Sequence, residues 1–92
     1  MSVTRTGRRF ARPTLVVHAL PAETPTFGVI VGKKLGNAVQ RNRVKRVLRH
    51  QAADLIPSTQ PMKVVVRALP GEGDLREDLV SAWNEAVRKV HP

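Results

Sequence analysis

The side chains best suited to binding a ligand are the positive charges between residues 33 and 49. They are Lys33, Lys34, Arg41, Arg43, Lys45, Arg46 and Arg49, and the amide of Asn42 lies among them. Arginine grips phosphate oxygens with a planar, two-pronged group, whereas lysine acts as a point charge. An amide can both donate and accept hydrogen bonds, so Asn42 suits a sugar hydroxyl or a base edge. These residue types in one short stretch predict a surface that binds a polyanion.

The overall charge supports the same interpretation because it is divided unevenly along the chain. The net charge is +9, and residues 1–49 contain eleven Lys and Arg residues against one acid, whereas residues 50–92 contain five against six. A one-sided excess indicates a nucleic-acid partner. The alternative is an ordinary solvated surface, but such surfaces usually mix charges of both signs. Near the N-terminus, Arg8, Arg9 and Arg12 are further candidates for RNA contacts.

No set of residues predicts a catalytic or metal site in the protein. The three histidines lack the spacing of metal ligands, and the chain contains no cysteine. A two-metal nuclease needs clustered carboxylates. The acids Asp74, Glu77 and Asp78 lie where a helix is expected to start, so capping accounts for them. We therefore expect no catalytic residue, no metal and no cofactor bound by the protein itself.

Three strands are predicted, over residues 14–20, 26–33 and 62–69, from their β-branched composition. A short turn joins the first two, which are most simply an antiparallel hairpin. The third contains three consecutive valines, which indicates a central position in the sheet or burial on both faces.

A basic helix is predicted between the second and third strands. It begins after Asn37, a good N-cap, and ends before Pro57. On a helical wheel, one face is apolar (Val44, Val47, Leu48, Ala52 and Leu55), the opposite face is polar (Asn42, Lys45, Arg46 and Arg49), and Arg41 and Arg43 flank the two sides. Like charges at these spacings repel, and Asp54 is the only acid on the helix. The polar face is therefore expected to meet an external anion.

A second helix is predicted at the C-terminal end. Asp74 is its N-cap, and Glu77 lies three residues on, as in a capping box. The residues that follow with helical spacing are Leu75, Leu79, Ala82, Trp83, Ala86, Val87 and Val90. Because Trp83 lies in the middle of this stripe, we expect it in the core and not in a base-stacking surface.

Ninety-two residues predict a single domain, residues 1–92, and its charge predicts that this domain binds nucleic acid. Residues 1–13 show no periodicity and contain Gly7 and Pro13, which predicts a basic arm that is extended or disordered. No apolar run of about 18 residues is present, as a membrane-spanning helix would require. The basic N-terminus also lacks the apolar core of a signal peptide. The expected location is cytoplasmic.

The stretch GKKLGNAVQRNRVKRVLRH, residues 32–50, resembles the signature of the bacterial ribonuclease P protein component. That family carries a lysine pair, then G-x-A-V, then R-N-x-x-K-R-x-x-R. The matching residues are Lys33, Lys34, Gly36, Ala38, Val39, Arg41, Asn42, Lys45, Arg46 and Arg49. The resemblance extends over most of the chain, from about Gly7 to Val90.

The resemblance implies an α+β fold, a two-layer sandwich with a small mixed sheet. It implies a left-handed β-α-β crossover through the basic helix, which departs from the usual right-handed preference. It also implies a function as the protein subunit of ribonuclease P, which removes the 5′ leader from precursor tRNA. In that family the RNA subunit carries out the chemistry with Mg²⁺, and the protein alone is inactive.

The partners implied by the resemblance are the catalytic RNA subunit, on the basic helix, and the precursor tRNA leader, in a cleft over the sheet. Neither a membrane nor DNA is expected as a partner. Family members usually begin with a helix and an aspartate–phenylalanine pair that helps line this cleft. Gly7 matches the glycine after that helix, so the sequence as given does not contain the segment, whether through a misplaced start, trimming or a true difference of this member. Its loss would weaken leader binding more than binding to the RNA subunit.

Other functions fit the residues less well. A structural RNA-binding protein of ribosomal type is the main alternative, although a general basic helix need not keep the whole motif register. A helix-turn-helix DNA binder would need a second helix where the valine-rich strand lies. A nuclease that works without RNA is disfavoured because the basic half contains only one carboxylate, Glu23.

Overall fold

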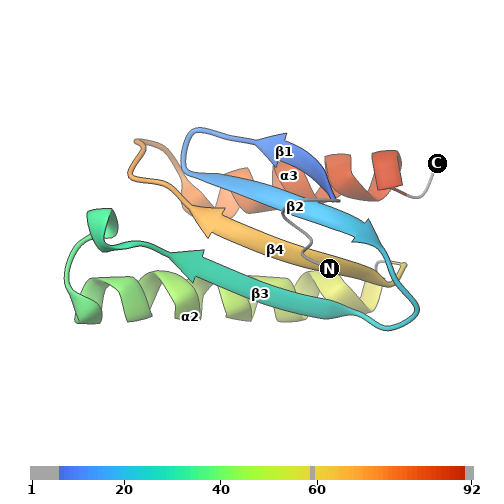
Figure 1. The fold of residues 1–92 in the computed structure, drawn as a ribbon, viewed down its shortest axis with the longest axis horizontal. Coiled ribbons are helices and arrows are strands. Elements are labelled where there is room, and N and C mark those ends of the chain that lie inside the picture. Colours follow the sequence, from blue (N-terminus) through green and yellow to red (C-terminus); the bar gives the residue numbers. More distant parts are fainter. Residues whose placement is uncertain (1–6, 59, 91–92) are drawn as a thin grey trace.

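Four strands and two long helices make up the part of the chain that the computed structural model describes, residues 7–58 and 60–90 (Figure 1). In chain order the elements are β1 (Arg8–Ala11), β2 (Leu15–Pro21), β3 (Thr26–Val31), the 3₁₀ turn η1 (Lys33–Leu35), α2 (Ala38–Leu55), the 3₁₀ turn η2 (Ile56–Ser58), β4 (Met62–Ala68) and α3 (Leu75–Val90). The α+β class, the mixed sheet and the two helices are confirmed.

The strands form one sheet in the order β1-β2-β4-β3. Strand β4 is antiparallel to β2 and parallel to β3, so β3, α2 and β4 form a β-α-β crossover. The predicted hairpin between the first two strands is wrong. Strand β4 lies between β2 and β3 and forms backbone hydrogen bonds with both. If β2 and β3 paired directly, β4 could pair on only one side, and the backbone groups on its other side would lack a strand partner.

The central position predicted for the valine-rich strand is confirmed, but burial on both faces is not. Along β4, Val64 and Val66 are buried, whereas Lys63 and Arg67 are exposed and Val65 is half-buried. Alternation of this kind shows that one face of the sheet packs on the core and the other is open to solvent.

The prediction of an arm without regular structure is wrong for residues 8–11, which form β1. This edge strand pairs antiparallel with β2, and Phe10 lies opposite Val17. Phe10 is only 6% exposed and belongs to the core cluster. A four-residue strand that contains two arginines carries little sequence signal, since its stability comes from pairing with β2 and from burial of one side chain. Residues 1–6 lie outside the described residues.

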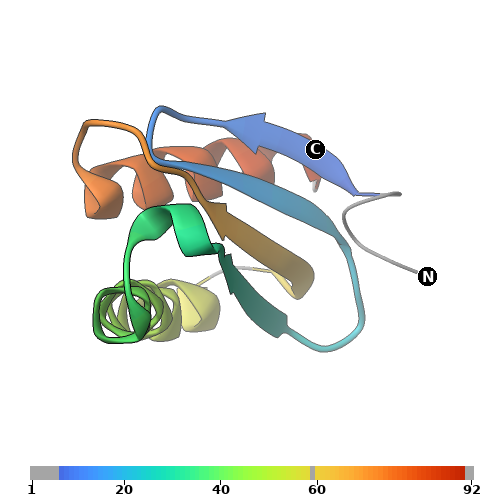
Figure 2. The same cartoon turned by 60° about the vertical axis from the view of Figure 1, so that its left-hand side comes forward.

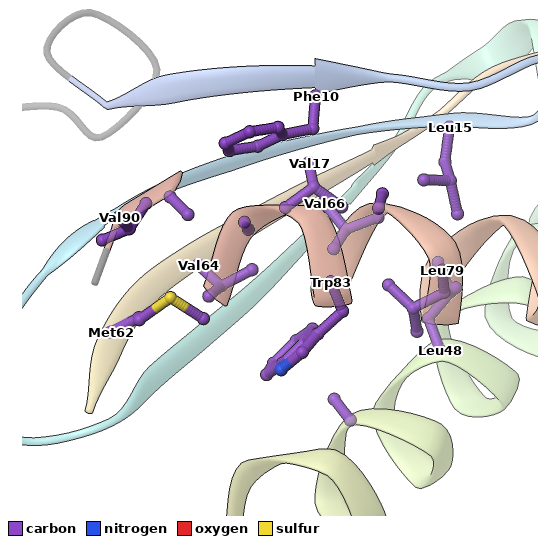
Figure 3. Packing of buried hydrophobic residues seen from close by; sticks show 14 of the residues in the cluster. Phe10, Leu15, Val17, Leu48, Met62, Val64, Val66, Leu79, Trp83 and Val90 are labelled. Atoms are coloured by element: carbon purple, nitrogen blue, oxygen red, sulfur yellow. The ribbon is translucent and has the colours of Figure 1, made fainter. Parts of the chain in front are cut away.

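Both helices pack on one face of the sheet and make the second layer of the sandwich (Figure 2). The strands contribute alternate side chains, among them Leu15, Val17, Val64 and Val66, and Figure 3 shows them meeting residues of α2 and α3. Trp83 is 2% exposed, which confirms its predicted place in the core. Its ring lies 6.0 Å from that of Phe27, at a tilt of 40°.

The start of α2 is stabilised as the sequence predicted. Asn37 accepts a hydrogen bond from the Gln40 backbone, and the Gln40 side chain accepts one from the Asn37 backbone, each at 2.9 Å. Gly36 precedes this cap with φ at +114°, a conformation that disfavours any other residue. One boundary was misplaced: β3 ends at Val31, and Lys33 begins η1 because the chain turns between Gly32 and Gly36.

The predicted N-cap of α3 at Asp74 is confirmed. Asp74 Oδ1 accepts hydrogen bonds from the backbone N–H groups of Arg76, at 3.0 Å, and Glu77, at 3.1 Å. Within residues 7–58 and 60–90, no helix is long and apolar enough to cross a membrane.

Candidate nucleic-acid interface

The outer face of α2, defined by Asn42, Arg43, Arg46 and Arg49, is exposed along its length. One side of the same helix packs on the core through Leu48 and Ala52, so the opposite side must point to solvent. Within the described residues, none of the cations on this face forms an ion pair with a carboxylate. Their charges are therefore available to an external anion. Asn42, Lys45, Arg46, Arg49 and His50 also line a shallow hollow of about 310 Å³.

Two of the predicted site residues are less accessible than the rest. Arg41 and Lys45 are half-buried, and Arg41 Nε is buried with no hydrogen-bond partner in the described part of the chain. Arg41 lies two turns before Leu48, within about 20° of it on the helix, so it follows the packing face and not the outer face.

Lys33 and Lys34 lie in η1, exposed, at the end of β3. They line a hollow of about 450 Å³ together with Ile30, Arg67 and Leu69. This hollow lies where the parallel strands β3 and β4 end. Its lining includes Lys33 and Lys34 from η1 and Arg67 from the open face of the sheet. The lysine pair therefore lies between the outer face of α2 and that open face.

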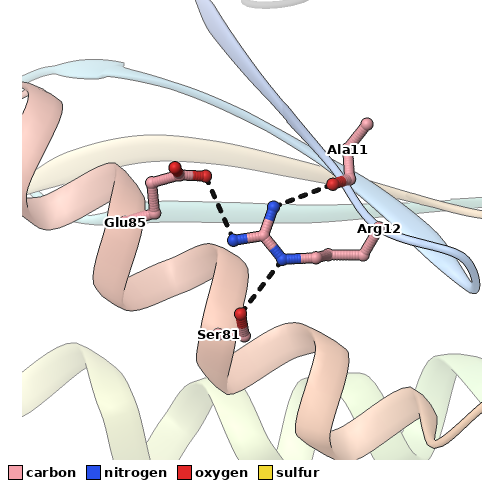
Figure 4. A network of polar contacts seen from close by, with 4 residues as sticks. All are labelled: Ala11, Arg12, Ser81 and Glu85. Carbon is pink, nitrogen blue, oxygen red and sulfur yellow. Dashed lines mark hydrogen bonds and ion pairs between the residues drawn. The ribbon is translucent and has the colours of Figure 1, made fainter.

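The three N-terminal arginines have different surroundings. Arg12 is held within the protein: its Nε donates to Ser81 Oγ at 3.0 Å, its Nη1 to the Ala11 carbonyl at 2.8 Å, and its Nη2 forms an ion pair with Glu85 at 3.0 Å (Figure 4). Arg8 Nη1 donates to the Lys89 carbonyl at 3.1 Å. Arg9 is exposed and lies opposite His18 on the open side of the sheet. Of the three, only Arg9 makes no side-chain hydrogen bond or ion pair with the described residues.

The open face of the sheet carries Arg9, a predicted candidate, together with two cations that the sequence reasoning missed, Lys63 and Arg67. Arg9 on β1 and Lys63 and Arg67 on β4 project from it, and among the described strand positions on this face there is no carboxylate. Residues 63 and 67 are four apart in a strand and so share a face, a period-two signal that was available in the sequence. Around these cations lie the uncharged residues Val16, Leu20, Thr26, Gly28, Ile30 and Val65.

His18 occupies the middle of this open face, paired with Arg9 on one side and Val65 on the other. Burial, and then the neighbouring charges of Arg9 and Arg67, lower the pKa of His18 below its ordinary value. The imidazole is therefore neutral near pH 7. A neutral ring between two arginines can stack on a base while the arginines meet phosphates.

The acidic residues near the start of α3 have structural roles. Asp74 caps the helix, and Asp78 Oδ2 accepts hydrogen bonds from Thr14 N and Thr14 Oγ1, at 3.0 and 2.6 Å. The sequence analysis expected helix capping to account for Asp78, but this residue also connects α3 to the turn before β2 through these hydrogen bonds. Residues 7–58 and 60–90 contain no group of three or more His, Cys, Asp or Glu side chains that could hold a metal ion.

Comparisons with known proteins agree with the motif at residues 32–50. The family model for ribonuclease P matches residues 1–91. The ribonuclease P protein component of Clavibacter michiganensis is 43% identical over 97 residues, which cover 96% of this chain and 86% of that protein. The corresponding protein of Streptomyces bikiniensis is 49% identical over 82 residues, covering 76% and 67%.

Solved structures show the same fold. The RNase P protein from Thermotoga maritima superposes with a TM-score of 0.75 at 19% identity, covering 98% of this chain and 89% of that one. A Staphylococcus aureus RNase P protein mutant, described as having defective mRNA degradation activity, gives a TM-score of 0.81 at 24% identity, covering 91% and 78%. At these identities the likeness establishes the architecture alone.

The family match spans nearly the whole chain, and relatives above 40% identity carry one name. This agreement confirms the resemblance carried by Lys33 to Arg49. It also leaves the ribosomal-type alternative without support. The chain belongs to the family of ribonuclease P protein components, the protein subunits of the tRNA-processing endoribonuclease ribonuclease P.

Proposed function

We propose that α2 and η1 bind the catalytic RNA subunit of ribonuclease P. The residues that make this contact are Lys33, Lys34, Arg41, Asn42, Arg43, Lys45, Arg46 and Arg49. The observation that carries the proposal is the exposed outer face of α2, whose cations pair with no carboxylate in the described residues. Such cations neutralise phosphates and release the counterions condensed on RNA, which makes binding favourable and salt-dependent.

The open face of the sheet binds the single-stranded 5′ leader of precursor tRNA. Arg9, Lys63 and Arg67 supply positive charge there without a neighbouring acid on the strands. His18 and the half-buried Val65 offer surfaces for bases, since single-stranded RNA binds through stacking and apolar contacts as well as phosphates. The hollow beside Lys33 and Arg67 connects this face to the RNA-subunit contact. Arg12 is not part of this surface because α3 already holds its guanidinium.

The protein contributes binding and leaves the chemistry to the RNA subunit, which uses Mg²⁺. Its positive charges take the place of some of the cations that two RNA molecules need to approach each other. Addition of the protein should therefore lower the Mg²⁺ concentration required for cleavage. Neither a catalytic residue nor a cofactor of its own is assigned to the protein.

A processing assay tests this division of labour. The purified protein, a bacterial catalytic RNA subunit and a precursor tRNA are combined at low Mg²⁺, and cleavage at the mature 5′ end is measured. The expected result is stimulation by the protein and no cleavage by the protein alone. Cleavage at that position by nuclease-free protein without the RNA subunit would contradict the proposal, as would a lack of stimulation.

A further inference from the structure

A groove lies between α2 and the first turn of α3, outside the surface that the motif describes. Two adjoining hollows of about 420 and 540 Å³ form it, and they share Val47 and Arg76. We refer to these joined hollows as the α2–α3 groove. Val47 was expected on the packing face from the helical wheel, but it belongs neither to the core cluster nor to the hydrophobic residues packed against that cluster, and it lines this groove.

A hydrogen bond holds the two walls of the groove together. Gln51 Nε2 on α2 donates to the Arg76 carbonyl on α3 at 2.7 Å. The floor beside this contact is apolar, formed by Val44, Val47 and Leu75. An apolar floor between fixed walls can receive the ribose or base face of a nucleotide, and its rim must then meet the phosphates.

The rim of the groove carries more positive than negative charge. Arg43, Arg46 and Arg76 are all exposed, and within the described residues none of them pairs with a carboxylate. The acids on the rim are Asp54 and Asp74, and Asp74 Oδ1 is already occupied by the N-cap hydrogen bonds. Three guanidiniums with unused donors favour an anion with several oxygens, such as successive phosphates.

The groove is continuous with the proposed RNA contact. Arg46 and His50 line the groove, and the same two residues line the hollow on the outer face of α2. An RNA strand that lies across the outer face therefore reaches the groove without leaving the positive surface. Arg76 extends this surface from α2 onto α3.

We propose that the α2–α3 groove binds a further stretch of the sugar–phosphate backbone of the RNA subunit, with Arg76 as an RNA-contacting residue outside the family motif. This inference rests on the proposed function, because it assumes that the outer face of α2 already meets the same RNA. It adds a second line of contact that would orient α2 on the RNA as well as hold it.

A matched pair of variants tests the role of Arg76. Arg76→Ala and Arg88→Ala remove the same charge from the same helix, and both side chains are exposed. The two positions lie about 18 Å apart along α3. Affinity for the RNA subunit is measured over a range of salt concentrations. The salt slope is the slope of the logarithm of the binding constant against the logarithm of the salt concentration. Arg76→Ala should weaken binding roughly threefold to tenfold and reduce the magnitude of this slope by about 0.7–0.9. Arg88→Ala should leave both the affinity and the slope unchanged.

A second readout locates the RNA directly. The chain contains no cysteine, so Arg76→Cys provides a single attachment point for a hydroxyl-radical reagent. RNA bound in the groove should be cut at a localised set of nucleotides from position 76 and much less from Arg88→Cys. Equal behaviour of positions 76 and 88 in both experiments would overturn the groove assignment. If Arg46→Ala/Arg49→Ala still weakened binding, the proposed function would stand without the groove. If that double variant also had no effect, both would fail.

Discussion

The carboxylate of Asp78 accepts two hydrogen bonds from Thr14, one from its backbone N at 3.0 Å and one from its hydroxyl at 2.6 Å. Asp78 lies in the first turn of α3 and Thr14 directly precedes β2, so the pair joins the helix layer to the sheet. Thr14 is 4% exposed, and loss of the carboxylate would leave its polar groups buried without that partner.

Asp78→Ala should therefore destabilise the fold by about 1–3 kcal/mol, the cost of leaving a buried polar group unsatisfied. The measurement is chemical denaturation, with Glu72→Ala as the control, because Glu72 is an exposed acid in the loop before α3. Equal stability of the two variants would show that the Thr14–Asp78 pair does not hold α3 to the sheet.

The second prediction concerns Gly36. This residue belongs to the family motif, but its role is structural, unlike the motif residues that are proposed to bind RNA. Its φ of +114° is unfavourable for other residues, and an added Cβ would overlap the Gln40 side chain that completes the cap of α2. Gly36→Ala should cost about 1–3 kcal/mol in stability. Gly32→Ala is a suitable control because a Cβ there meets nothing within 4 Å. Denaturation midpoints that shift equally in both variants would contradict this role.

Trp83→Ala should cost about 3–5 kcal/mol as a large-to-small change in the core. Trp83 is 2% exposed and lies against Phe27, so its fluorescence should be blue-shifted in the folded protein and respond little to added RNA. Strong quenching by a short single-stranded RNA, combined with near-normal stability of the variant, would show that this residue faces the ligand.

His18 predicts how stability changes with pH. Its pKa is lowered in the folded protein, chiefly by burial and then by Arg9 and Arg67, so the unfolded chain binds the proton more readily. The contribution of neutral His18 is fully present above its unfolded pKa, roughly 6.5, and is lost as the pH falls below that value. His18→Gln should therefore lose less stability than the parent protein between about pH 7.5 and pH 5.

The stability of the parent protein and of His18→Gln is measured by chemical denaturation at each pH. The same pH dependence in the parent protein and in His18→Gln would rule out titration of His18 as the cause.

The elements that the sequence predicted well are those specified by neighbouring residues. The N-caps at Asn37 and Asp74 and the apolar stripe around Trp83 act within a few helical turns, so their pattern appears directly in the chain. The sheet order could not be predicted in the same way. The pairing of β2 with β4 joins residues more than 40 positions apart, and β1 is stabilised mainly by its pairing with β2 and the burial of Phe10.

The same distinction applies to the candidate site. The motif at Lys33 to Arg49 located the exposed cations of α2, because a helix places them by its period alone. Arg67 on the open face and Arg76 beside α2 were missed, since only the fold brings them next to the motif residues. Arg12 was also a candidate for RNA contact, and the sequence did not indicate that Ser81 and Glu85 of α3 contact its guanidinium.

The central claim is that the exposed cations of α2 bind the RNA subunit, and the salt dependence of RNA binding tests it most directly. Arg46→Ala/Arg49→Ala is compared with Arg88→Ala/Lys89→Ala, which removes two exposed charges from α3. The first double variant should reduce the magnitude of the salt slope by about 1.4–1.8, the change expected for the loss of two phosphate contacts. It should lose little folding stability. The second should keep the slope of the parent protein. Identical slopes for the two double variants would contradict the assignment of α2 as the RNA-binding surface.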